Sequence, residues 1–268
     1  MKASLLEKLY LIVLRDLRTG IRYRGGFWME VAGTFAELST FFFLAAAIGG
    51  SYRPQGMDYF SFLVIGTSVL GFLAAGVYLF VNTVRQAQMT GTMEVLMTTA
   101  TPGWIIILLT AISSFTARLL PTVLYIAAGL FLFGAPVGAV RLAPAAVVFV
   151  LSILVALAIG MLAGAMQVAL QRGGGVTTLI ATVASFFCGA MFPINALPRT
   201  LQLVSRAIPF TYSIHGLRAT LVAGSSLGDV STDIVALAAF AAVLLPIGTG
   251  VFALALRRAR QQGTLSFY

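Results

Sequence analysis

The stretch Arg85–Pro102, RQAQMTGTMEVLMTTATP, decides how the chain is organised. It lies between two strongly apolar runs, Tyr59–Val84 and Trp104–Phe133, and its charged and amide side chains are too polar for lipid. Apolar residues still recur along it at helical spacing, at Met89, Met93, Leu96 and Met97. Its Thr-Pro end stops a helix, because the residue before proline disfavours the helical conformation. We therefore expect a short amphipathic helix in water between two membrane spans, placed to dock another protein.

The composition is that of an integral membrane protein. Of 268 residues, 59% are hydrophobic and 9% are charged, and the mean hydropathy is +0.99. Soluble domains carry about 25% charged residues. The net charge of +9 does not indicate nucleic-acid binding, because most basic residues flank apolar runs. The single cysteine, Cys188, excludes a disulfide within the chain. We expect an all-α membrane protein, with residues 1–268 forming one transmembrane domain.

Six apolar runs are expected to be membrane spans. Lipid offers the backbone no hydrogen-bond partners, so each span should be helical, and about 20 residues are needed to cross. One run carries a G-x-x-x-G pattern at Gly160 and Gly164, which favours close helix packing. The runs are Phe27–Ile48, Tyr59–Val84, Trp104–Phe133, Leu142–Leu170, Val176–Phe192 and Ile234–Leu256.

The distribution of basic residues predicts the orientation. Residues 4–24 combine an apolar face with a cationic face, which is typical of a helix lying in the membrane interface. Together with the Arg85 and Arg172 loops and the C-terminal tail, the N-terminal segment places eleven Lys and Arg residues on one side, against five on the other. Since basic residues mark the cytoplasmic side, both termini and the stretch 85–102 are predicted to be cytoplasmic.

The connection after the fifth run is too apolar for an ordinary solvated loop. Residues 193–230 are predicted to face the outside and to form two short helices that re-enter the outer leaflet, which is tolerated where such pieces pack on protein. They would cover whatever lies between the spans. The residues that shape this extracytoplasmic lid are expected to be Phe192, Pro193, Leu197, Pro198, Pro209 and Tyr212.

Two opposite charges fall near the middle of apolar runs. Glu37 lies in the first run and Arg118 in the third, and an unpaired ion at this depth costs at least about 2.5 kcal/mol. We hypothesise that they pair, within one chain or across a dimer interface. Such a pair could have one of two roles. It could gate or line a transport pathway, or it could only hold the spans together, and the second role is the simpler interpretation.

Three segments occur in an order that resembles a known family. They are the basic amphipathic YLIVLRDLRTGIRYRGGFW, the cytoplasmic GTMEVLMTTATP and the external FPINALPRTLQLVSRAIPFTYSIHGLR. In this order they resemble the type-2 permeases of bacterial ATP-binding-cassette (ABC) exporters, a family of drug, polysaccharide and lipid export subunits. The resemblance covers essentially the whole chain.

The resemblance implies partners and a docking site. It implies that Arg85–Pro102 is the coupling helix that sits in a groove of an ATPase subunit, with two ATPase copies and a second permease copy, identical or different, in the bacterial inner membrane. The short loop around Arg172 would also contact the ATPase. The residues expected to couple to it are Arg85, Gly91, Thr92, Met93, Glu94, Leu96, Thr99, Pro102 and Arg172.

The chain itself is expected to be non-catalytic. It contains no G-x-x-x-x-G-K-[ST] motif to hold nucleotide phosphates, so ATP and Mg²⁺ would be bound by the partner ATPase and no cofactor by this chain. The only histidine, His215, gives no basis for a zinc site. Clustered carboxylates or a nucleophile–base pair at membrane depth, which a membrane enzyme would need, are not found.

We expect a permease subunit of an ABC exporter that moves an amphipathic, drug-like or lipid-like substrate out of the cytoplasm or the inner leaflet. One alternative is a lipid-linked polysaccharide exporter, whose channel would need aromatic rings along a continuous lumen. Another is an ion-coupled secondary transporter, which needs carboxylates at the midplane and broken helices. Glu37 is a single carboxylate near the midplane, so it supports the ion-coupled alternative only weakly.

Overall fold

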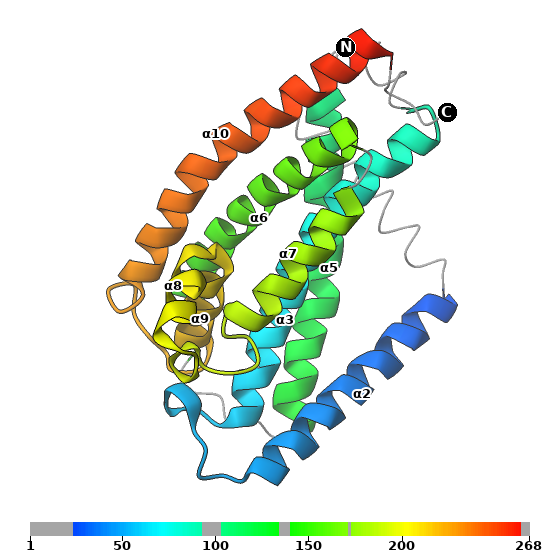
Figure 1. Cartoon of the computed structure of the whole chain (residues 1–268). Helices are drawn as coiled ribbons and strands as arrows, with labels where there is room; N and C mark the ends of the chain where they lie inside the picture. The colour runs from blue at the N-terminus through cyan, green and yellow to red at the C-terminus, as the bar shows by residue number, and fades with distance from the viewer. Residues whose placement is uncertain (1–23, 93–102, 134–139, 171–172, 264–268) are drawn as a thin grey trace.

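The computed structural model describes residues 24–92, 103–133, 140–170 and 173–263, and the regular elements in these ranges are all helical (Figure 1). The interfacial helix predicted at 4–24 lies outside the described residues, except for Arg24, where α2 begins. The helices are α2 (Arg24–Ile48), α3 (Tyr59–Met89), α5 (Gly103–Leu132), α6 (Leu142–Leu170), α7 (Gly173–Phe187), α8 (Arg199–Ala207), α9 (Pro209–Leu221) and α10 (Ser231–Gln262), with 3-10 turns η1 (Pro54–Gly56) and η2 (Ile194–Ala196).

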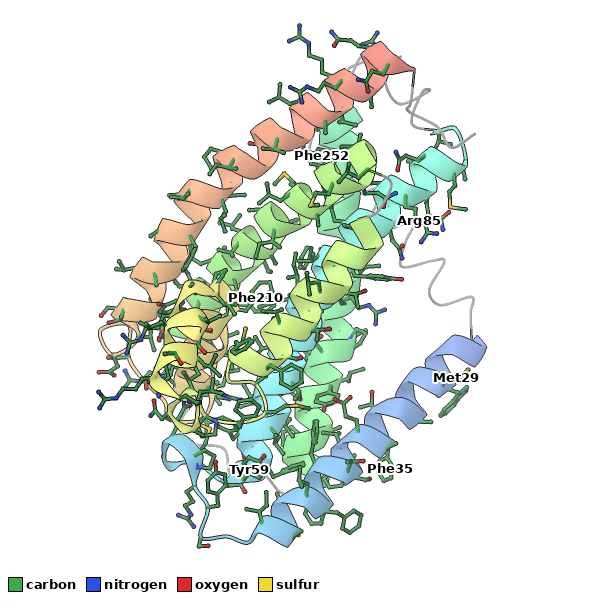
Figure 2. The ribbon with its side chains drawn as sticks, viewed as in Figure 1. Met29, Phe35, Tyr59, Arg85, Phe210 and Phe252 are labelled. Carbon is green, nitrogen blue, oxygen red and sulfur yellow. The ribbon has the colours of Figure 1, made fainter. Side chains whose placement is uncertain are left out.

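A helix occupies each of the six predicted spans, and consecutive long helices run in alternating directions (Figure 1). The start of α3 meets the end of α5, where the rings of Phe60 and Phe133 lie 5.6 Å apart. The ends of α3 and α6 meet at the opposite side of the molecule, where Gln167 donates a hydrogen bond to Gln88. Figure 2 shows the same polarity, with Tyr59 and Arg85 towards opposite ends of α3.

The helix lengths distinguish α7 from the others. Helices α2, α3, α5, α6 and α10 have 25 to 32 residues, which exceeds the roughly 20 residues that a crossing needs. In the described part of the chain, α3, α6, α10 and Val31–Ile48 of α2 are long and apolar enough to cross a membrane. Helix α7 has 15 residues, a length of about 22 Å against a hydrocarbon core of about 30 Å.

Three predicted boundaries were wrong, and one is the end of the sixth span, which was expected at Leu256 although α10 continues to Gln262. The stretch 85–102 was expected to be separate from the second span, but α3 continues through Arg85 to Met89. Its end is capped by Thr90, whose backbone N–H and side-chain hydroxyl both donate to the carbonyl of Gln86, and by Gly91 at φ +67°. The fifth span was expected to reach Phe192, but α7 ends at Phe187, before a turn that places Gly189 at φ +72°.

The core is built around α3, which packs against α2, α5, α6, α7 and α9. Phe80 of α3 illustrates the packing, because it is 1% exposed and its ring lies 5.3 Å from that of Phe252 in α10. The G-x-x-x-G pattern has the predicted packing role. A Cβ atom on Gly164 would lie 2.5 Å from the ring of Phe80, and one on Gly160 would lie 3.4 Å from its Cβ. The two glycines therefore let α6 approach α3 closely.

Helix α2 is the most peripheral of the long helices. Its C-terminal half packs on α3 and α5, with Leu38 and Phe41 buried and the ring of Phe42 5.4 Å from that of Phe133. Towards its start it diverges from the other helices, and Met29 there is 78% exposed (Figure 2). A pocket lined by several polar residues lies between α2, α3 and α5.

Candidate functional site

The predicted docking stretch begins as a continuation of α3. Arg85 is exposed on the last turns of that helix (Figure 2). At the helix end, the hydroxyls of Thr90 and Thr92 lie 2.8 Å apart, and Thr92 also donates to the carbonyl of Ala87. Gly91 adopts the left-handed conformation, with φ +67°, that is common just after the end of a helix. Met93, Glu94, Leu96, Thr99, Pro102 and Arg172, which were expected to complete the site, lie outside the described residues.

A buried amide pair lies just inside this end of the molecule. Gln88 on α3 and Gln167 on α6 are each 1% exposed, and Nε2 of Gln167 donates to Oε1 of Gln88 at 3.1 Å. The side-chain Nε2 of Gln88 is buried with no hydrogen-bond partner. The pair therefore links the two helices that lead into the connections around 93–102 and 171–172. The sequence reasoning missed it, although two glutamines at the ends of apolar runs were its visible signal.

Glu37 and Arg118, the two predicted intramembrane charges, line the same pocket. It lies between α2, α3 and α5 and contains about 190 Å³ of space. The structure places both charges at one site without assigning them a bond to each other. The remaining lining residues are Thr34, Thr67, Ser68, Gly71, Phe72, Ala75, Pro121, Thr122 and Tyr125. We call this site the α2–α3–α5 pocket.

The hydroxyl groups of this pocket follow one pattern. Thr67, Ser68 and Thr122 donate their protons to backbone carbonyls of their own helices, at 2.8, 3.1 and 2.9 Å. Their oxygen lone pairs therefore remain able to accept a hydrogen bond. The hydroxyl of Tyr125 is buried beside Thr67 and Glu37 but makes no hydrogen bond of ordinary geometry. These residues come from three helices, so sequence reasoning did not bring them together with the two charges.

The predicted extracytoplasmic lid consists of η2, α8 and α9. Pro198 occupies the N-cap position of α8, with φ −55° and ψ 149°. Pro209 is buried at the first position of α9, and Tyr212 donates to the carbonyl of Arg206 at 3.0 Å. Phe192, Pro193 and Leu197 are half-buried in the preceding loop. Helix α9 packs on α3, α6 and α10, so the lid is attached to the bundle.

Arg218 on α9 is the anchor of this lid, and its role was not predicted. The charge count assigned it, as one of five basic residues, to the side opposite the termini, and in the structure it is 2% exposed. Its Nε and Nη2 donate to the carbonyl of Phe62 at 3.1 and 2.7 Å, Nη1 donates to Gly189 at 2.7 Å, and Nη2 donates to Ala190 at 2.6 Å. The guanidinium also lies 3.5 Å from the ring centroid of Phe62.

The environment of Arg218 explains two glycines. A Cβ atom on Gly66 would overlap the guanidinium of Arg218 and the carbonyl of Ala190, so only glycine leaves room for the side chain. Gly189 supplies one of the accepting carbonyls from its positive-φ turn. Burial lowers the pKa of Arg218 to about 9, which still leaves it charged at neutral pH. In the sequence, Arg218 is the single arginine of the largely apolar segment PFTYSIHGLRATL, and this position could have indicated that its side chain is buried and holds the lid to the bundle.

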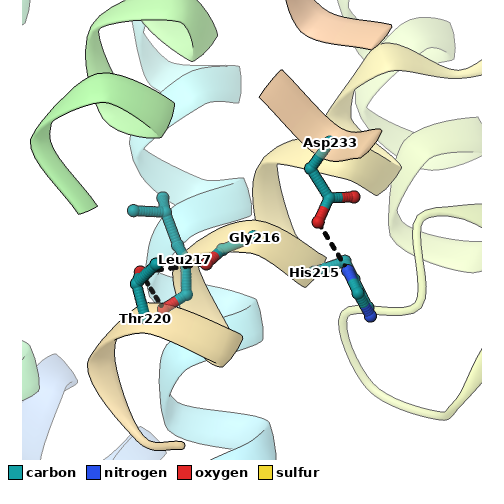
Figure 3. A network of polar contacts seen from close by, with 5 residues as sticks. All are labelled: His215, Gly216, Leu217, Thr220 and Asp233. Atoms are coloured by element: carbon teal, nitrogen blue, oxygen red, sulfur yellow. Dashed lines mark hydrogen bonds and ion pairs between the residues drawn. The ribbon is translucent and has the colours of Figure 1, made fainter. Parts of the chain in front are cut away.

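His215 makes a second contact between the lid and the bundle. Its Nδ1 lies 2.8 Å from Oδ2 of Asp233 in the first turn of α10 (Figure 3). The histidine side chain is 54% exposed and that of Asp233 is 8% exposed. The hydrogen bond to Asp233 is the largest of the effects that raise the pKa of His215. In the same network, the hydroxyl of Thr220 donates to the carbonyl of Gly216 at 2.9 Å.

Comparisons with known proteins agree with this architecture. Residues 8–222 match the sequence model of the family described as ABC-2 type transporter. The chain is also 38% identical over 74 residues to Nodulation protein J from Rhizobium meliloti (strain 1021). That second match spans 28% of this chain and 28% of the relative.

Proposed function

Because the chain belongs to the ABC-2 type transporter family, we propose that it is the membrane-spanning permease subunit of an ATP-driven exporter. The observation that carries the proposal is the family match over residues 8–222, which includes the whole stretch 85–102. As a member of this family, the chain is a multi-pass membrane permease of an ABC transporter. Export, the partner and the substrate are the proposed parts.

Energy would come from a partner ATPase that docks on residues 85–102 and on the loop around Arg172. These 268 residues hold no phosphate-binding G-x-x-x-x-G-K-[ST] motif, so nucleotide and Mg²⁺ would be bound by that partner. Helix α3 supports this route, because it is continuous from Tyr59 to Met89 and leads directly into the docking stretch. The Gln88–Gln167 pair would pass movement of that stretch to α6.

The proposed assembly contains two permease copies and two ATPase subunits in a bacterial inner membrane. In each copy, α2, α3, α5, α6, α7 and α10 would be the six spans, with both termini in the cytoplasm. The alternating directions of the six helices support this topology. Helices α8 and α9 would re-enter the outer leaflet, supported by their packing on the bundle and by the Arg218 anchor.

The substrate would be amphipathic. An apolar groove with about 530 Å³ of space lies between α3, α5, α6 and α9, and it shares the wall residues Phe72 and Thr122 with the α2–α3–α5 pocket. Polar and apolar surfaces next to each other favour a substrate that has both. The ion-coupled alternative is weaker, because Glu37 lines its pocket together with the cation Arg118 rather than with further carboxylates.

Co-purification tests the partnership. The permease would be co-expressed with a candidate ATPase, and the complex recovered through a tag on the ATPase. We expect a Met93→Asp change, which puts a charge on the apolar face of the docking stretch, to reduce recovery about tenfold or more. A matched Gln262→Asp change, at an exposed residue at the same end of the molecule, should leave recovery unchanged. Failure of the unchanged permease to bind any ATPase would overturn the proposal.

A further inference from the structure

We propose that a groove between the C-terminal ends of α6 and α10 binds an anionic phospholipid of the surrounding membrane, with the lipid phosphate at Arg258. The lipid would be a resident ligand of the permease and not its transported substrate. The inference depends on the chain being a membrane permease, and not on the proposed export or the proposed ATPase. The groove contains about 530 Å³ of space, and its wall includes Met166, Leu170, Val251, Leu254 and Arg258. We call it the α6–α10 groove.

The wall of the α6–α10 groove combines one stripe of side chains from each helix. On α10, Val251, Leu254 and Arg258 follow each other at spacings of three and four residues, so they lie on one face. On α6, Met166 and Leu170 are four residues apart and share a face in the same way. All five side chains are exposed, although the two helices pack against each other. The groove therefore holds an aliphatic surface and a cation within one open space.

The position of the groove along α10 matches the position of a phospholipid in a bilayer. The apolar run Ile234–Leu256 is about 34 Å long at 1.5 Å per residue, and the hydrocarbon core of a membrane is about 30 Å thick. Arg258 follows just after this run, which places it at the level of the lipid head groups. Leu254 and Val251 precede it and fall within the hydrocarbon. A lipid with its phosphate at Arg258 would therefore have an acyl chain beside the aliphatic wall.

The charge at this end of α10 favours an anionic head group. The helix ends with three exposed arginines, Arg257, Arg258 and Arg260. Helix α6 contains no acidic residue, and the one acidic residue of α10, Asp233, lies in its first turn, at the opposite end. The two helices that form the groove therefore do not neutralise these cations. Basic pockets between transmembrane helices bind the head groups of anionic lipids, and a guanidinium can hold a phosphate through two parallel hydrogen bonds.

The groove lies away from the spaces considered for the substrate. Helices α10 and α2 are on opposite sides of the bundle (Figure 1). The groove is lined by α6 and α10 alone, and it shares no wall residue with the α2–α3–α5 pocket or with the apolar groove between α3, α5, α6 and α9. A lipid bound there would bridge the ends of α6 and α10 without occupying either space.

A simpler interpretation is that the three arginines attract anionic lipids without a defined site, because basic residues commonly flank membrane spans. The two interpretations differ at Arg257. It carries the same charge as its neighbour Arg258, but only Arg258 lines the groove. A diffuse attraction depends on the number of charges, so the loss of either arginine would have the same effect. A defined site depends on Arg258, which makes Arg257→Gln the matched control for Arg258→Gln.

A second matched pair tests the aliphatic part of the groove. Ala169 lines the groove and is exposed, so Ala169→Phe places a ring in the space that an acyl chain would occupy. Ala253 of α10 is also exposed but does not line the groove, so Ala253→Phe is the control. Both changes add the same apolar ring and leave the net charge unchanged.

Native mass spectrometry of the purified full-length permease, titrated with dioleoyl-phosphatidylglycerol, counts bound lipids and gives their affinity. We expect Arg258→Gln to weaken binding about tenfold, and Arg257→Gln to change it less than about twofold. Ala169→Phe should weaken binding about fivefold or more, whereas Ala253→Phe should bind like the unchanged protein. Dioleoyl-phosphatidylcholine, which has the same chains and no net charge, should bind about tenfold more weakly. Glycerol phosphate, which has the anion without chains, should not displace the lipid.

Equal losses in Arg257→Gln and Arg258→Gln would overturn the proposal in favour of diffuse attraction. Equal affinity for phosphatidylcholine would overturn it by showing an apolar groove without head-group selection. Displacement by glycerol phosphate would do so by indicating a site for free phosphate. The same titration of the permease with its ATPase tests for a protein occupant, because loss of the lipid on assembly with the ATPase or with a second permease copy would show that a protein covers the groove. Retention of the lipid in the assembled complex is the expected result.

Discussion

Arg218 stabilises the end of the molecule that carries α8 and α9, through hydrogen bonds to backbone carbonyls. In an Arg218→Met variant, the carbonyls of Gly189 and Ala190 would lose their donor, and that of Phe62 would keep only the hydrogen bond within α3. Each unpaired buried group costs about 1–3 kcal/mol, so we expect the free energy of unfolding to fall by about 3 kcal/mol or more. Arg218→Lys should be nearly as damaging, because an ammonium does not reproduce the planar fork of a guanidinium.

Thermal unfolding in one detergent would test this prediction. The control is Arg206→Met on the exposed surface of α8, where we expect a change within about 0.5 kcal/mol. If the Arg218→Met and Arg206→Met proteins unfold at the same temperature, the lid is not anchored by this side chain.

His215 makes the stability of the contact between α9 and α10 depend on pH, and the sign of this dependence follows from the raised pKa of His215. The hydrogen bond to Asp233 raises the pKa of His215 above the ordinary value of 6.5, and partial burial and, to a smaller extent, the nearby Arg218 oppose this. The stabilisation is therefore complete below about pH 6.5 and is lost as the pH rises through the folded-state pKa. Because the histidine side chain is 54% exposed, the effect should stay below about 1 kcal/mol.

The comparison of unchanged protein with His215→Gln measures this effect. The difference in melting temperature should be largest near pH 5.5 and disappear near pH 9, within the range set by the ordinary histidine pKa. Asp233→Asn should remove the same pH dependence. A difference that grows with pH instead would mean that the charged histidine does not contribute through Asp233.

At the scale of elements, the sequence predicted which stretches are helical better than where the helices end. Apolar runs located α2, α3, α5, α6 and α10, because lipid requires helix wherever a run is long. The end of α3 was misplaced, since Gln88 looks like a solvent residue in sequence but is buried against Gln167 of α6. The end of α7 was misplaced because Arg218, far along the chain, binds the Gly189 turn.

The same limit applies to the candidate site. Glu37 and Arg118 could be singled out from the sequence, because a charge within an apolar run is conspicuous. Tyr125, Thr67 and Thr122 could not, since hydroxyl residues in spans commonly bond to their own helix, as Thr67 and Thr122 also do. Only the packing of three helices shows that they share a pocket with the charges.

The Gln88–Gln167 pair yields a prediction about how α3 and α6 are joined. Either single change to leucine removes the hydrogen bond between the two buried amides, so we expect each to cost about 1–3 kcal/mol. The double change removes both amides and should cost less than the sum of the two single changes. Unfolding of the four proteins in a double-mutant cycle measures this coupling. Strict additivity would show that the two helices do not depend on the pair.

At the scale of the whole molecule, the proposed topology places the connection before α10 outside the cell and the end of α10 inside. Cys188, 1% exposed, is the only cysteine, so a Cys188→Ser background permits single-site labelling. In intact cells, a membrane-impermeant maleimide should label Leu227→Cys but label Gln262→Cys only after permeabilisation. Both positions are exposed. The reverse pattern would invert the orientation and place residues 85–102 on the wrong side for an ATPase.

The central claim is that ATP hydrolysis in a partner drives this chain through residues 85–102. Its most direct test is the ATPase activity of the reconstituted complex, compared between the unchanged permease, Glu94→Ala and the control Gln262→Ala. The account predicts that the unchanged permease and Gln262→Ala give the same activity. Glu94→Ala should lower it about tenfold, equivalent to about 1.4 kcal/mol of lost coupling. Identical activity in all three, or a chain that binds no ATPase, would contradict the account and favour ion-coupled transport.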